Sequence, residues 1–212
     1  MTAHSSQPRW RRLDADERRE QILTCAVRLF GQRPYVAVST SDLAGEAGVT
    51  RSLLNHYFGT KRDLYVEVVR RMVQLPQLDA AVAATGPLTE RVELSVAWFL
   101  DTISEHGSTF VAITGAEGVA NDPDIARIIA DADDLAARRV LETLDVDAGD
   151  PAQQATIRAY SGLVKAAVRE WIRDETLTRA QVQLLLSQAL LAIVRDVLPA
   201  LDRPRPQRSS DS

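Results

Sequence analysis

Residues 39–60, STSDLAGEAGVTRSLLNHYFGT, decide the fold, because they place two short helix signals on either side of a glycine. Ser39 and Asp42 have the spacing of a capping box, with Asp in the place usually taken by Glu, and predict the start of the first helix. Gly48 predicts its end after about two turns. Thr50 can cap a second helix. Two short helices joined by a tight glycine-containing turn have the proportions of a helix-turn-helix.

The second of these helices carries polar side chains suited to reading DNA. The second helix of a helix-turn-helix enters the major groove, where Arg recognises guanine and Asn recognises adenine. If Val49, Leu53 and Leu54 pack inward, the residues left to face the bases are Arg51, Ser52, Asn55 and His56. Side chains placed to contact phosphates are Ser39, Thr50, Tyr57 and Lys61. Spacing alone leaves a second interpretation open, an ordinary helical hairpin with a solvated polar face.

The order of residues over a longer stretch favours DNA binding. Residues 22–65, ILTCAVRLFGQRPYVAVSTSDLAGEAGVTRSLLNHYFGTKRDLY, resemble the DNA-binding domain of TetR-family transcriptional regulators. Three pieces carry the resemblance: LF at the end of the first helix, DLAGEAGVT across the turn, and HYFGTKRDLY leading into the fourth helix. Pro34 departs from the family, which often has Gly there, and Asn55 stands where Tyr is usual. The operator sequence therefore cannot be carried over from relatives.

The resemblance implies a homodimeric repressor that binds a palindromic operator and is released by a small molecule in its C-terminal domain. It also places the family's base-reading and phosphate-contacting positions on the same eight residues. A basic arm with Arg9, Arg11 and Arg12 either reaches a minor groove or is a solvated tail.

The 3.6-residue hydrophobic period recurs along nearly the whole chain, and no alternating strand pattern is present, which predicts an all-α protein. The expected helices, about nine, cover residues 15–30, 39–48, 50–58, 60–75, 88–106, 109–118, 122–144, 150–173 and 178–198. The expected organisation is a disordered basic arm (1–13), a three-helix DNA-binding domain (14–59), a larger helical effector-binding and dimerisation domain (60–200) and a disordered tail (201–212).

Charge is divided unevenly along the 212 residues. The whole chain has a formal charge of −4, yet residues 1–74 carry +4 and the remainder −8. A basic N-terminal unit suits a polyanionic partner. The 45% of hydrophobic residues is ample for a globular core.

Several classes of site and location are not expected. The single cysteine, Cys25, excludes an internal disulfide, and three scattered histidines give no metal site, so no metal and no cofactor are expected. The longest apolar run, residues 184–194, is too short to cross a membrane. The N-terminus has no apolar signal segment, so the expected location is the cytoplasm.

The last two helices have apolar surface suited to a dimer interface. The last helix is apolar on more than one side, with Leu184, Leu185 and Leu191 lying off its main stripe. The residues expected at the interface are Ile157, Val164, Val168, Ile172, Val182, Leu186, Leu190, Ile193 and Val197. The alternative is that this surface is covered by the protomer's own core.

An effector pocket is expected among the helices of residues 60–175, as the family resemblance implies. Its candidate wall consists of Met72, Trp98, Phe99, Phe110, Thr114, Tyr160 and Trp171, with His106 and Glu117 as polar anchors. For any single aromatic, ordinary core packing is the alternative, and it is favoured over a place in the pocket wall. His106, beside Gly107, can also simply end a helix.

Two other functions are alternatives to a ligand-gated regulator: an enzyme, and a DNA-binding regulator without an effector. The chain contains no nucleophile elbow, glycine-rich phosphate loop or HExxH motif, so an enzyme is not expected. A DNA-binding regulator with no small-molecule effector fits the sequence as well as a ligand-gated one does.

Overall fold

The computed structural model describes residues 14–74, 86–115 and 122–201, and every regular element in these ranges is helical. The α-helices are α1 (Ala15–Gln32), α2 (Thr40–Glu46), α3 (Arg51–Phe58), α4 (Lys61–Val73), α6 (Leu88–Ser104), α7 (Gly107–Thr114), α8 (Pro123–Thr143), α9 (Pro151–Ile172), α10 (Arg179–Ala192) and α11 (Leu198–Leu201). A 3₁₀ turn, η1 (Tyr35–Ala37), precedes α2, and a π-helical turn, η2 (Ile193–Val197), joins α10 to α11. With α10, η2 and α11 counted as one continuous helix, the described residues contain nine helices. The all-α prediction and the helix number are confirmed.

The helix starts follow from side chains read in the sequence. Reciprocal capping boxes join Ser39 to Asp42, Thr60 to Asp63 and Thr178 to Gln181. Asp122 and Asp150 each precede a proline and accept hydrogen bonds from the first backbone N–H groups of α8 and α9. The predicted arm with Arg9, Arg11 and Arg12, the candidate Glu117 and the tail from residue 202 lie outside the described residues.

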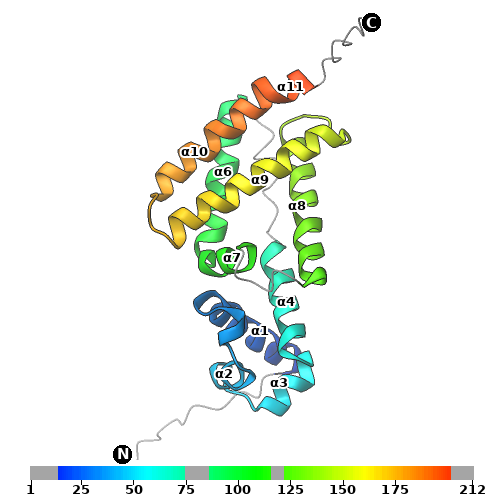
Figure 1. The fold of residues 1–212 in the computed structure, drawn as a ribbon, viewed down its shortest axis with the longest axis vertical. Coiled ribbons are helices and arrows are strands. Elements are labelled where there is room, and N and C mark those ends of the chain that lie inside the picture. The colour runs from blue at the N-terminus through cyan, green and yellow to red at the C-terminus, as the bar shows by residue number, and fades with distance from the viewer. Residues whose placement is uncertain (1–13, 75–85, 116–121, 202–212) are drawn as a thin grey trace, which may run out of the picture.

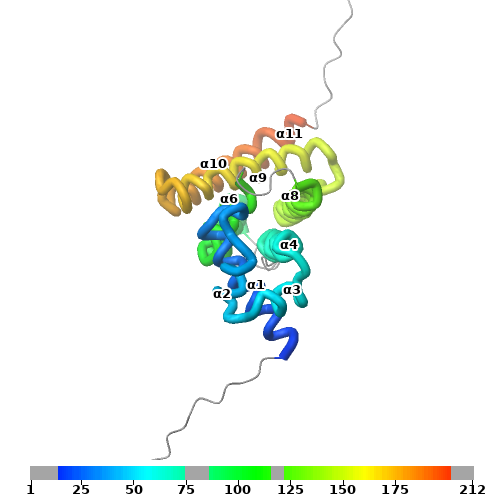
Figure 2. Tube along the Cα trace, turned by 60° about the horizontal axis from the view of Figure 1, so that its bottom comes forward, coloured from blue at the N-terminus to red at the C-terminus, as the bar shows by residue number. Residues whose placement is uncertain are grey.

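The helices form two groups joined by α4 (Figure 1). The first group, α1 to α3, lies at one end, and α9 and α10 run side by side at the other, in both views (Figure 2). Helix α4 packs against α1 on one side of this division and against α8 on the other, while α7 packs against α1. Buried apolar side chains continue from one group into the other, so the two groups share one hydrophobic core.

The final continuous helix, residues 179–201, keeps much of its apolar surface exposed. Leu184 is 63% exposed and Leu185 is 41% exposed. By length and composition alone this helix is able to cross a membrane, although the apolar run of residues 184–194 within it is too short to do so. That is weak support for a span, because core helices of globular proteins pass the same test.

Candidate nucleic-acid interface

Helix α3 separates a buried face from an exposed polar face. Leu54 is fully buried and Phe58 nearly so, on the side of the helix that packs against α2 and α4. The opposite face contains the four predicted base-reading residues, all exposed: Arg51, Ser52, Asn55 and His56. Thr50 caps this helix by accepting a hydrogen bond from the Leu53 N–H at 3.2 Å. The structure therefore brings these polar side chains together in the first two turns of α3, the part that reads bases in helix-turn-helix proteins.

The turn between α2 and α3 depends on a left-handed glycine. Gly48 has φ of +64°, a conformation that other residues rarely adopt. Ala47, just before it, is 1% exposed, and the Val49 N–H donates to the Ala44 carbonyl at 2.9 Å. This tight turn sets the angle at which α3 leaves α2.

Two predicted phosphate contacts, Ser39 and Thr50, are helix caps. The Ser39 hydroxyl donates to an Asp42 carboxylate oxygen at 2.8 Å and accepts from the Asp42 N–H at 3.1 Å. Hydrogen bonds from the Ser39 backbone N–H and then from its hydroxyl lower the pKa of Asp42. Thr50 uses its oxygen as an acceptor and keeps its O–H for another partner. Both side chains stand at helix N-termini, where an anion is favoured.

Lys61 has a structural role besides the predicted phosphate contact. Its ammonium donates to the carbonyls of Tyr35 at 3.0 Å and Val38 at 2.8 Å, and lies 4.0 Å from the centre of the Tyr35 ring. A lysine ammonium has three N–H donors, so one remains for a phosphate. Tyr57, the other predicted contact, is half-buried, and its ring lies edge-on to that of His56 with centroids 5.5 Å apart.

Tyr35 belongs to an aromatic cluster that was not predicted from the sequence. Its ring centre lies 4.8 Å from that of Tyr65 and 5.9 Å from that of Phe30. The cluster joins α1, η1 and α4, and so holds the segment that leads into α2. An aromatic directly after Pro34, close to the helix-turn-helix, was the available signal.

A charged junction lies between α4 and α8. The Arg62 guanidinium binds both carboxylate oxygens of Asp122, at 2.6 and 2.8 Å, and an oxygen of Asp124 at 2.7 Å. The Asp122 side chain is only 7% exposed. The hydrogen bonds from Arg62 are the largest cause that lowers the pKa of Asp122, and hydrogen bonds to Asp122 and Asp124 raise the pKa of Arg62.

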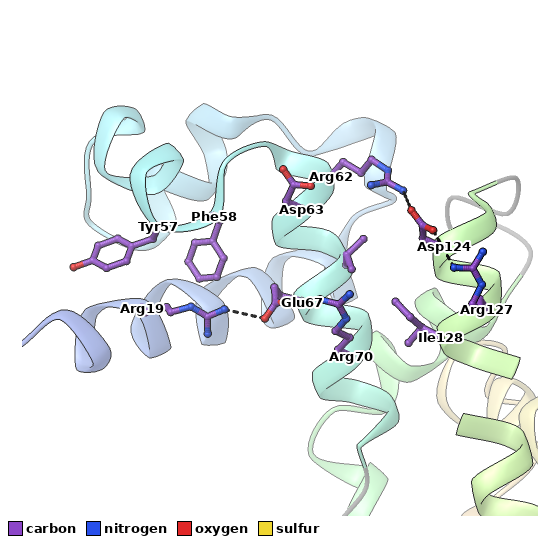
Figure 3. A pocket seen from close by; sticks show the side chains of 11 residues that line it. Arg19, Tyr57, Phe58, Arg62, Asp63, Glu67, Arg70, Asp124, Arg127 and Ile128 are labelled. Carbon is purple, nitrogen blue, oxygen red and sulfur yellow. Dashed lines mark hydrogen bonds and ion pairs between the residues drawn. The ribbon is translucent and has the colours of Figure 1, made fainter. Parts of the chain in front are cut away.

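Beside this junction is an open cavity of about 460 Å³ bounded by α1, α3, α4 and α8 (Figure 3). Its arginines are paired with carboxylates: Arg19 and Arg70 both bind Glu67 at 2.8 Å, and Arg127 lies 3.5 Å from Asp124. A second cavity of about 320 Å³ lies near the aromatic cluster, between α1, α7 and the end of α9. Neither cavity is lined by any of the predicted effector residues.

Most predicted effector residues are packed in the helical core. Met72, Phe110 and Tyr160 are buried, and the Tyr160 hydroxyl donates to the Leu186 carbonyl at 3.0 Å. Phe110 meets Phe99 edge-on, with centroids 6.2 Å apart. The Thr114 hydroxyl donates to the Phe110 carbonyl. Of the remaining described candidates, Trp98, Trp171 and Thr114 are half-buried and His106 is exposed.

The protomer itself covers much of the predicted dimer face, which stays a prediction. Five of its residues are buried inside the single protomer and face its own core: Ile157, Val168, Val182, Leu186 and Leu190. Val164, Ile172 and Ile193 are half-buried, and only Val197 is exposed. A side chain that its own protomer covers has no surface left for a partner. The open apolar face of α10 instead carries Leu184 and Leu185.

Comparison with known proteins agrees with this geometry. Residues 22–68 match the sequence family described as bacterial regulatory proteins, tetR family, and residues 88–193 match the tetracyclin repressor-like C-terminal domain. The HTH-type transcriptional activator FasR of Mycolicibacterium smegmatis is 30% identical over 172 residues, which are 79% of this chain and 78% of FasR.

Solved structures share the fold. A tetR-family transcriptional regulator from Streptomyces coelicolor superposes with a TM-score of 0.71 at 25% identity, covering 89% of this chain and 88% of that one. A transcriptional regulator from Saccharomonospora viridis, solved in complex with choline, has a TM-score of 0.61 at 22% identity and covers 85% and 97% of the two chains.

The fold and the exposed face of α3 define a helix-turn-helix DNA-binding transcriptional regulator. The chain belongs to the TetR family, a family of regulators and not of enzymes.

Proposed function

We propose that this protein is a homodimer that binds a palindromic operator and loses affinity for it when a small, largely apolar molecule enters the C-terminal domain. The observation that carries the proposal is the exposed polar face at the start of α3, which combines Arg51 and Asn55 on a helix held by a capped, glycine-dependent turn. These two side chain types make bidentate contacts to guanine and adenine. The cytoplasm, where the chromosome lies in bacteria, remains the proposed location.

The dimer is supported by exposed faces on α9 and α10, two helices that pack against each other. Leu184 and Leu185 are exposed on α10, and Ala155, Ala159 and Gly162 form an exposed row of small residues on α9. Two copies of this helix pair can pack as a four-helix bundle, in which small residues allow close approach and the leucines fill the interface.

Ligand gating is supported by the position of α4. Its first residue, Lys61, holds the segment before α2, and its last turn places Met72 in the shared core. A molecule bound against that core can tilt α4 and so change the distance between the two α3 helices of the dimer, which are its reading helices. Half-sites lie about 34–36 Å apart, or a multiple of that, so a change in separation weakens binding. The Saccharomonospora relative, which holds choline, supports a fold that accepts small ligands.

Repression is the proposed effect on transcription, and activation is the second candidate. The activator FasR resembles this chain across both domains, which favours the second candidate as a specific alternative. Transcription in vitro from promoters with the operator placed upstream of, or across, the polymerase site separates the two effects.

Selection of bound DNA from a random pool tests the proposal directly. We expect enrichment of a palindrome by the wild-type protein and loss of preference at one position of each half-site for Arg51→Ala. No enrichment by the wild-type protein would contradict sequence-specific binding.

A ligand screen then tests the gating. Compounds that raise the melting temperature, choline among them, are titrated against the protein–operator complex. The coupling free energy is expected to be about 1–3 kcal/mol, and operator DNA must weaken ligand binding by the same factor. If every stabilising compound leaves operator affinity unchanged, the effector-independent regulator replaces the ligand-gated one.

A further inference from the structure

One cluster of charges joins the start of α4 to the start of α8. Arg62, the second residue of α4, binds Asp122 through two hydrogen bonds and Asp124 through a third. The same Asp122 carboxylate caps α8, since it accepts from the N–H groups of Asp124 at 3.0 Å and Ile125 at 3.4 Å. A bidentate arginine–carboxylate pair fixes the relative orientation of its partners better than a single hydrogen bond does.

The residue before Arg62 holds the other side of the molecule. Lys61 donates to the carbonyls of Tyr35 and Val38, which lie in and directly after η1, next to the capping residue of α2. The first turn of α4 is thus tied by Lys61 to the segment that leads into α2 and by Arg62 to the start of α8. Movement of α8 relative to α4 therefore changes the contacts of Arg62.

We propose that Arg62 is a positioning residue for operator binding: its ion pairs with Asp122 and Asp124 hold α4 against α8 and so fix the placement of α3 in the dimer. This inference rests on the proposed function. Without the ion pairs, α4 occupies a wider range of orientations, and fewer dimers have the separation of reading helices that the operator requires. Apparent affinity falls in proportion to the population of the competent state.

A direct phosphate contact by Arg62 would predict a different pattern of mutant effects. Arg62→Ala weakens DNA binding in either case, because it removes a cation. Asp122→Asn distinguishes the two roles. It leaves Arg62 charged and frees it from one carboxylate, so a phosphate contact would strengthen, whereas a positioning role predicts weaker binding. Asn is as good a helix cap as Asp, so α8 keeps its start.

Asp150→Asn is the matched control for the change of cap. Asp150 precedes Pro151 as Asp122 precedes Pro123, and it caps α9 by accepting from the N–H groups of Ala152 and Gln153. A loss of affinity caused only by a weaker cap would appear in both variants. Asp124→Asn is a milder second variant, because Asp124 is half exposed and provides one of the three hydrogen bonds.

Affinity for the operator selected by the wild-type protein is measured by fluorescence anisotropy over a range of salt concentrations. We expect Asp122→Asn to bind about 5–20-fold more weakly with an unchanged salt slope, Asp124→Asn to show a smaller loss, and Asp150→Asn to match the wild type. In the Arg62→Ala/Asp122→Asn double variant, the second change should add little. Wild-type or tighter binding by Asp122→Asn, or additive losses in the double variant, would overturn the proposal.

A distance measurement on the free dimer completes the test and does not depend on DNA. Spin labels at Ser41→Cys, exposed on α2, in a Cys25→Ala background report the separation of the two reading units. We expect a narrow distance distribution for the otherwise unchanged protein and Asp150→Asn, and a broad one for Asp122→Asn. Equal widths would overturn the positioning role even if the operator is never found. Failure of the wild-type protein to select DNA would instead contradict the proposed function.

Discussion

Thr109 on α7 occupies the space beside Gly31 on α1. Its hydroxyl donates to the Val27 carbonyl at 2.9 Å, and a Cβ atom on Gly31 would overlap the Thr109 hydroxyl oxygen. Thr109 is 2% exposed, so the contact lies inside the shared core. Helix α7 therefore packs closely against α1, at a place separate from the ion pairs of Arg62, and this close approach needs a glycine.

Gly31→Ala is expected to destabilise the protein by about 1–3 kcal/mol, the usual cost of overpacking. Alanine favours a helix over glycine by about 0.5–1 kcal/mol, which offsets part of the loss. Urea unfolding at pH 7 measures the difference. Gly45→Ala on α2 is the control, because nothing lies within 4 Å of the added Cβ. It should leave stability unchanged or raise it, and equal effects of the two changes would contradict the overlap at Thr109.

Arg51→Ala is expected to lower operator affinity by about 1–3 kcal/mol and to relax preference at one base pair of each half-site. Arg51 is exposed on the first turn of α3, so its removal should leave the melting temperature close to that of the wild type. Affinities for operators substituted at single positions check this. A uniform loss over all sequences would mean that Arg51 contacts a phosphate.

Lys61→Ala should differ from Arg51→Ala in two measurements. Operator and unrelated DNA should weaken alike, and the salt slope should fall by roughly 1 for each subunit, because a phosphate contact is lost. The melting temperature should also fall, because the Tyr35 and Val38 carbonyls lose their donor. An unchanged salt slope with a lower melting temperature would restrict Lys61 to its structural role.

Local signals in the sequence predicted the helices well, and contacts between distant segments could not be predicted. Ser39 with Asp42 marks a helix start through atoms three residues apart, and the structure has that capping box. The partner of Asp122 is Arg62, 60 positions away, and nothing in the local pattern selects it among many arginines. The capping role of Asp122 was therefore readable, whereas its contact with α4 was not.

The last helix shows a second limit of prediction from sequence, which concerns the side of a helix that is buried. Periodicity finds apolar stripes on a helix but does not tell which stripe its own protomer covers when more than one side is apolar. Leu186, on the main stripe, is 1% exposed, whereas Leu184, off that stripe, is 63% exposed. The prediction assigned the main stripe to the partner because the packing of α6 and α9 against α10 could not be read from the sequence.

Leu184→Glu is accordingly expected to dissociate the proposed dimer, while the protomer stays folded. Light scattering at micromolar concentration should fall from about twice the 23.3 kDa chain mass to that mass, with an unchanged circular dichroism spectrum. Leu186→Glu, the matched change on the buried face, should unfold the protomer, because it buries an unpaired charge. A Leu184→Glu protein that keeps the mass of a dimer would place the interface elsewhere.

The stability that Asp122 provides should depend on pH in a defined direction. Hydrogen bonds from Arg62 lower the pKa of Asp122 below its ordinary value of 3.8. Since the folded state then binds the proton less readily than the unfolded state, the contribution is present in full well above pH 3.8 and is lost as the pH falls through the lowered pKa.

The difference in unfolding free energy between the wild-type protein and Asp122→Asn should therefore be constant from pH 7 to about pH 5 and shrink below about pH 4. Urea unfolding of both proteins in steps between these values measures it. Other acidic caps, such as Asp42 and Asp63, also have lowered pKa values, but they are common to both proteins and cancel in the difference. A difference that stays constant to pH 3, or grows as the pH falls, would show that Arg62 does not hold the ionised form of Asp122.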